Sequence, residues 1–157
     1  MISKELYKEI EKYIKDNYVE EDLYYPNDFL CVCGQALDID LKPEATFSET
    51  LLKLIDERKL SDSQAYGKAN IDRRLFSKIR SNKNYNPSRN TVLAFCIALN
   101  LDIDTAEDLL ERAGYALGHS TNSDLIIRLF LEKKKDYTLF DVDDALMSFN
   151  LKPISKY

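Results

Sequence analysis

Nine of the 22 basic residues of this 157-residue chain lie in the window 58–89, which holds only two acidic residues. This basic window therefore carries a net charge of +7, whereas the whole chain carries −5. The flanks are acidic: residues 1–45 carry −6, residues 46–57 carry −2 and residues 90–157 carry −4. Because a local patch matters more than the total charge for meeting a polyanion, the pattern favours contact with nucleic acid. The alternative is an ordinary solvated face rich in Lys and Arg.

Residue types suited to enzymatic catalysis do not form a recognisable constellation. His119 is the only histidine, and it stands in a Gly118-His119-Ser120 turn without an evident partner in the sequence. We interpret it as a capping or surface residue. No glycine-rich loop that could cradle a phosphate is present in the sequence. We therefore expect no enzyme, no catalytic residue and no cofactor.

Possible metal ligands are equally scattered. Cys31 and Cys33 are separated by one residue, unlike the two-residue spacing typical of structural zinc, and no second pair follows. We expect them to be buried among apolar residues. Asp141, Asp143 and Asp144 are not followed by a loop of oxygen ligands with a closing Glu, so we assign their charges to the start of a helix, where the dipole favours anions. The sequence predicts no metal site.

The elements that position the basic window are helices. With four Gly and four Pro and with apolar residues at helical spacing, the chain is expected to be all-α. Between residues 46 and 114 the pattern predicts five helices, the third at about 72–81 and the fourth at about 88–99, with Cys96 in the core. Side chains suited to cap a helix start precede four of these helices. The first helix has Thr46 or Ser48, and the second has Ser61, Asp62 or Ser63. The third has Asp72, and the fifth has Asp102 or Asp104. Asn70 suits a left-handed turn, and Gly114 suits a helix stop.

Helical extensions are expected on both sides of this block, giving three parts: 1–45, 46–114 and 115–157. The first part begins with a helix from Ile2 to about Val19 and continues irregularly, with a short strand or an apolar turn at 29–33. The last part contains two helices, at 124–134 and 139–149.

The block 46–114 resembles the phage-repressor, or Xre-type, helix-turn-helix family. The stretch 64–72 (QAYGKANID) matches the second helix and turn, and 73–80 (RRLFSKIR) matches the recognition helix. Pro87-Ser88 and 93–99 match the loop proline and the fourth helix. The sequence departs from the family at three positions. Tyr66 stands where the family has a small residue, and its size would set the second and third helices further apart. Asn70 stands in place of the Gly of the turn. Asp62 stands in place of a Gln that holds a phosphate, and its charge would repel one.

The resemblance implies a DNA-binding surface. In that family the third helix enters the major groove, so its outward residues would meet base edges and phosphates, while Phe76 and Ile79 face the core. The next loop would lie along the DNA backbone. The residues carried over to the DNA are Arg73, Arg74, Ser77 and Lys78 on the helix, with Lys83, Asn84 and Arg89 after it.

We therefore expect a non-enzymatic, sequence-specific DNA-binding transcriptional regulator of bacterial or phage type. The alternative is an adaptor or accessory subunit that holds a protein partner, such as a defence enzyme or toxin. Stretches around 69–82 and 109–119 are also similar to bacterial proteins that join such a block to unrelated catalytic domains, which implies a module used in several contexts, including phage defence or stress.

The expected partners are double-stranded DNA and a second copy of the chain, or another protein. One recognition helix contacts few base pairs, so specificity normally needs two half-sites. Two apolar sets could form a dimer interface or could equally close onto their own domain; these are Ile2, Leu6, Ile10 and Ile14, and Leu125, Leu129, Val142 and Leu146. The longest apolar runs are too short to span a bilayer and no signal segment opens the chain, so we expect a soluble, cytoplasmic protein without membrane contact.

Overall fold

The computed structural model describes residues 2–19, 44–133 and 136–155. Within these ranges the chain forms helices and no strand, which confirms the all-α expectation. The predicted strand or turn at 29–33 and the pair Cys31 and Cys33 lie outside the described residues. The helices are α1 (Lys4–Asn17), α2 (Phe47–Glu57), α3 (Asp62–Lys68), α4 (Arg73–Ser81), α5 (Arg89–Ala98), α6 (Ile103–Arg112), α7 (Asn122–Glu132) and α8 (Leu139–Ser148).

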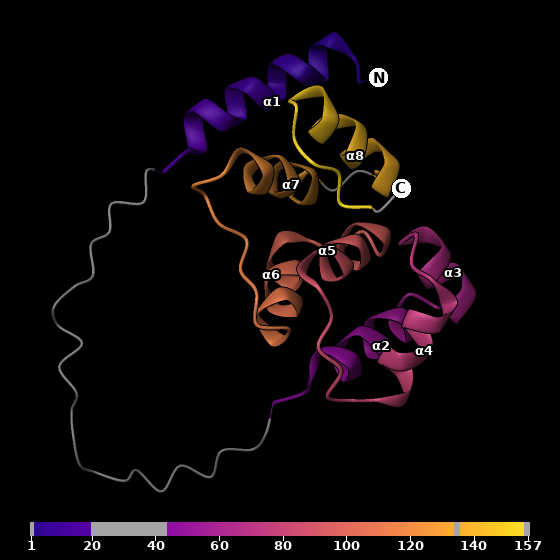
Figure 1. The fold of residues 1–157 in the computed structure, drawn as a ribbon. Helices are drawn as coiled ribbons and strands as arrows, with labels where there is room; N and C mark the ends of the chain where they lie inside the picture. Colours follow the sequence, from indigo (N-terminus) through magenta and orange to yellow (C-terminus); the bar gives the residue numbers. More distant parts are fainter. Residues whose placement is uncertain (1, 20–43, 134–135, 156–157) are drawn as a thin grey trace, which may run out of the picture.

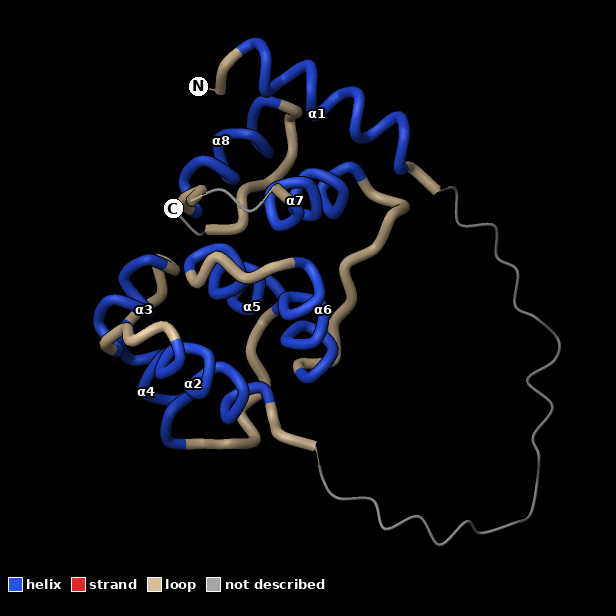
Figure 2. The backbone as a smooth tube through the Cα atoms, turned by 180° about the vertical axis from the view of Figure 1, so that it is seen from behind, coloured by secondary structure: helices blue, strands red, loops and turns tan. Residues whose placement is uncertain are grey.

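Helix α5 lies at the centre of the molecule. Every residue from Thr91 to Leu99 is buried, as expected for a helix that is apolar on all sides. Helices α2, α3 and α4 lie on one side of α5 and α6, and α1, α7 and α8 lie on the other (Figures 1 and 2). The described residues thus share one continuous apolar core, with α5 between its two sides.

Side-chain oxygens fix where the helices begin. Thr46 caps α2 and Ser61 caps α3, each within a reciprocal capping box, while Asp72 caps α4 and Asp102 caps α6. Each is one of the residues that the sequence put forward. The predicted left-handed turn is also present, since Asn70 has φ 51°.

The N-terminal helix α1 packs on α7 and α8 of the same chain. The Tyr7 ring stacks on Phe149 with 4.4 Å between centroids, and the Tyr13 hydroxyl donates to Glu132 at 2.8 Å. Burial, together with the Glu132 carboxylate, raises the pKa of Tyr13. Glu9 forms an ion pair with Lys133. The N-terminal helix α1 and the C-terminal helices α7 and α8 therefore pack together on one side of the fold (Figures 1 and 2).

Both apolar sets proposed for a dimer interface close onto this core. Leu125, Val142 and Leu146 are fully buried, and Leu129 is 6% exposed. Ile10 is also fully buried, while Ile2, Leu6 and Ile14 are partly buried against the core. Of the two possibilities left open by the sequence, the described structure has the enlarged core.

The aspartates at the start of α8 have different roles. Asp141 completes the α8 capping box by accepting the Thr138 N–H at 2.8 Å, as a helix-start charge should. Asp143 differs from the expectation, because it is only 1% exposed. Its carboxylate accepts the N–H groups of Ile154 at 2.6 Å and Ser155 at 3.3 Å, together with the Ser155 hydroxyl. Asp143 thus anchors the segment that follows α8.

We predict that Asp143→Ala lowers the free energy of unfolding by roughly 1–3 kcal/mol, because it leaves the buried Ile154 N–H without its acceptor. Urea unfolding followed by circular dichroism measures the change. The matched control is Asp56→Ala, which removes an exposed carboxylate and should change stability by about 0.5 kcal/mol or less. Equal effects of the two substitutions would contradict the anchoring role of Asp143.

Candidate nucleic-acid interface

A tight turn joins α3 to α4. Helix α3 ends at Lys68, and the left-handed Asn70 then reverses the chain direction. The Ile71 N–H donates to the Tyr66 carbonyl at 2.9 Å, which closes the end of α3. The Asp72 carboxylate accepts the Arg74 N–H at 3.1 Å and so starts α4 only a few residues later. These two hydrogen bonds set where α3 ends and where α4 begins.

Helix α4 has one buried face and one exposed face. Phe76 is 2% exposed and Ile79 is fully buried, as the sequence predicted. The Phe76 ring lies 5.6 Å from the Tyr66 ring and 6.1 Å from the Phe95 ring, so α4 is held against both α3 and α5. The side chains of Arg73, Arg74, Ser77 and Lys78 are all exposed. The structure therefore gathers these four predicted residues on the outer face of α4.

Tyr66, which departs from the family pattern, is half-buried at the α3–α4 contact. Its ring is inclined by 49° to that of Phe76. The large side chain thus fills space between the two helices and contributes to the core that supports α4.

Sequence reasoning missed Arg80. It lies on α4 at i+7 from Arg73 and i+3 from Ser77, a spacing that already placed it on their helix face. Its guanidinium pairs with Asp62 of α3 at 2.5 Å and lies 6.0 Å from the centre of the Phe76 ring. Asp62 was expected to repel a phosphate, but its charge is offset here by that of Arg80.

Lys83 and Asn84 lie exposed in the loop after α4. Two hydrogen bonds hold this loop in place. The Ser48 hydroxyl of α2 donates to the Asn82 carbonyl at 3.2 Å, and the Asn82 side chain accepts the Asn84 N–H at 3.0 Å. The pKa of Glu49 is lowered, chiefly because its carboxylate accepts the Thr46 N–H, with a smaller contribution from the charge of Lys83.

Arg89 stands apart from the other predicted residues. Its guanidinium donates to the Asp124 carboxylate at 2.7 Å and to the Ala116 carbonyl at 3.1 Å. The other Asp124 oxygen accepts the Gly118 N–H at 2.9 Å. Arg89 thus ties the start of α5 to the start of α7. Its predicted contact with the DNA backbone stays a prediction, and it would have to coexist with this tie.

The remaining candidates have no shared site. Cys96 is fully buried in α5, and burial raises the pKa of its thiol to about 12. His119 is exposed, and its backbone carbonyl accepts the Val19 N–H at 3.1 Å. Across the part of the chain that the structure describes, no group of three or more His, Cys, Asp or Glu side chains is placed to hold a metal ion.

None of the described helices has both the length and the apolar character needed to cross a membrane. Comparisons with protein-family models, curated proteins and solved structures give no match to this chain.

The contacts of Arg89 lead to a stability prediction. Arg89→Gln should lower the free energy of unfolding by roughly 1–3 kcal/mol, since the largely buried Asp124 loses its charged donor. Lys83→Gln, the same substitution at an exposed site, should change it by about 0.5 kcal/mol or less. Chemical denaturation of both variants measures the difference. An Arg89→Gln protein as stable as the parent chain would show that the ion pair contributes nothing.

Proposed function

We propose that residues 46–114, which contain α2–α6, form a five-helix repressor-like helix-turn-helix domain, and that the chain is a sequence-specific DNA-binding transcriptional regulator of bacterial or phage type. One observation carries this proposal: α4 exposes Arg73, Arg74, Ser77 and Lys78 while Phe76 and Ile79 anchor its other face. A rigidly held helix with a basic outer face is what major-groove recognition requires.

The chemistry of this face suits a DNA duplex. An Arg guanidinium can donate two parallel hydrogen bonds to guanine O6 and N7, so Arg73 and Arg74 are assigned to base edges. Ser77 and Lys78 can serve bases or phosphates. Lys83, Asn84 and Arg89 are assigned to the phosphate backbone, where their contacts would add affinity without sequence preference.

Specific recognition also calls for a second copy of the chain. Two recognition helices about one helical turn apart would read two half-sites. Because the two apolar sets put forward by the sequence pack against the core of their own chain, a homodimer would use another surface. Large apolar side chains that remain exposed in the described ranges are Tyr18, Val19, Phe140 and Met147. Light scattering at micromolar concentration, with and without DNA, measures the assembly.

We predict that the chain shifts random-sequence duplex DNA in a mobility-shift titration and that binding weakens steeply with salt. Each neutralised phosphate releases counterions, so about three contacts should reduce the affinity of one copy on the order of 40-fold between about 50 and 200 mM salt, and two copies bound together should show a steeper loss. Selection of bound duplexes over several rounds should then enrich one sequence pattern. Absence of any shift at low salt would contradict the proposal and favour the adaptor that holds a protein partner.

We predict that Arg73→Ala and Arg74→Ala each weaken binding to the selected sequence by roughly 1–3 kcal/mol and relax its specificity. Lys83→Ala should weaken all sequences alike, because a phosphate contact carries no base information. Fluorescence anisotropy against selected and scrambled duplexes separates the two effects. The control Lys53→Ala removes an exposed cation of α2 outside the basic window and should leave specificity unchanged. If the two Arg variants keep both affinity and specificity, the assignment of α4 is wrong.

A further inference from the structure

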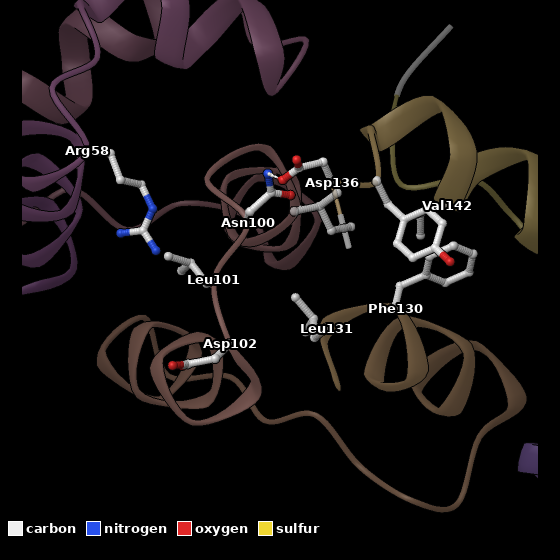
Figure 3. A pocket seen from close by; sticks show the side chains of 10 residues that line it. Arg58, Asn100, Leu101, Asp102, Phe130, Leu131, Asp136 and Val142 are labelled. Atoms are coloured by element: carbon white, nitrogen blue, oxygen red, sulfur yellow. Dashed lines mark hydrogen bonds between the residues drawn. The ribbon is translucent and has the colours of Figure 1, made fainter. Parts of the chain in front are cut away.

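A cavity of about 340 Å³ lies where the α5–α6 turn meets α7 and the start of α8 (Figure 3). Arg58, Ile97 and Asn100 reach it from the α2–α6 side, and Leu131 and Asp136 reach it from the other. Its size falls at the lower end of the range typical of small-molecule sites. It also lies between two layers of the fold, a place where such sites are common.

The inner wall of this cavity is apolar. It is formed by Phe130 and Leu131 of α7 and Val142 of α8, all of them buried. The Tyr137 ring meets Phe130 edge-on with 4.7 Å between centroids, which fixes one side of the wall. These side chains suit a branched or aromatic hydrocarbon group.

The outer wall carries charges of both signs. The Arg58 Nε donates to the Leu99 carbonyl at 2.6 Å, which fixes the guanidinium beside the cavity. On another side, the Asp136 carboxylate accepts the Asn100 amide at 3.1 Å. Arg58 and Asp136 both line the cavity, which therefore carries a cation and an anion (Figure 3). Among the described residues, Asp102 also lines the cavity.

We propose that this cavity binds a free apolar α-amino acid. The carboxylate of the amino acid pairs with Arg58, its ammonium group pairs with Asp136, and its side chain contacts Phe130 and Leu131. A neighbouring cavity of about 370 Å³ shares Asn100, Asp136 and Tyr137 and extends to Lys68.

Binding at this place has a mechanical consequence. Arg58 and Asn100 belong to the α2–α6 side, whereas Asp136 and Phe130 belong to the C-terminal side. A ligand that contacts both sides ties them together, and it must stabilise the folded chain by mass action.

Isothermal titration calorimetry of the full chain with L-phenylalanine and L-leucine tests the proposal. We expect a Kd below about 1 mM and a rise in the midpoint of thermal unfolding. Phenethylamine lacks the carboxylate and 3-phenylpropionate lacks the amine, so each should bind at least about tenfold more weakly than L-phenylalanine. No detectable binding of either amino acid, or equal binding of a single-charge analogue, would overturn the proposal.

Two variants of cavity residues and one control variant locate the site. Asp136→Asn and Arg58→Gln should each weaken L-phenylalanine binding at least about tenfold while circular dichroism shows the helices intact. In Asp136→Asn, L-phenylalanine should lose its advantage over 3-phenylpropionate, a result that a general loss of packing would not give. The control Asp56→Asn changes an exposed carboxylate outside the cavity and should leave Kd unchanged. Unaltered binding by both site variants would show that the amino acid binds elsewhere. Since calorimetry measures the ligand directly, these outcomes are independent of DNA binding.

Discussion

The burial of α5 is the constraint on which the rest of the fold depends. A helix that is apolar on every side from Thr91 to Leu99 must be covered all round by other elements. The Phe95 ring meets Phe76 of α4 on one side, and α6 and α8 pack against α5 elsewhere. Because the inner face of α4 is used in this way, its Arg and Lys residues have only the outer face left. The exposed basic surface is thus a consequence of how the core is covered.

Some arginines of this chain make structural hydrogen bonds between elements around α5, whereas others are exposed on α4. Arg58 and Arg89 bond to main-chain carbonyls across the fold, and Arg128 of α7 donates to Glu107 at 2.5 Å and to the Leu117 carbonyl at 2.7 Å. Arg128 is 7% exposed, and its Nε is buried without a hydrogen-bond partner, so this tie carries a desolvation cost. A guanidinium suits such positions since several donors point in fixed directions. The number of basic residues in a sequence window therefore does not tell which of them make structural hydrogen bonds and which form a binding surface.

The features that the sequence predicted are those set by residues close together along the chain. Caps such as Asp72, the left-handed Asn70 and the two faces of α4 follow from local hydrogen bonds and periodicity, and all are present. Contacts between distant residues were not predictable: Arg89 lies 35 positions from Asp124, and Asp143 meets a segment 11 positions later. Arg89 was assigned to the DNA backbone by its place in the resemblance, and Asp143 was assigned to the helix start by its place in the sequence. The cavity beside Arg58 was missed for the same reason, since its walls come from four separate stretches of the chain.

The acidic total and the basic window are compatible in the proposed complex with DNA. At physiological ionic strength, charges separated by more than about 8 Å are largely screened, so a duplex responds to the surface that it approaches. In both views of the fold, α3 and α4 lie at the opposite side of α5 from α1, which carries no net charge because its four Lys residues balance its four acidic residues (Figures 1 and 2). The basic window attracts the duplex to the face that carries Arg73 and Lys78. The local charge of the basic window therefore matters more than the total, and the net charge of −5 is no argument against binding.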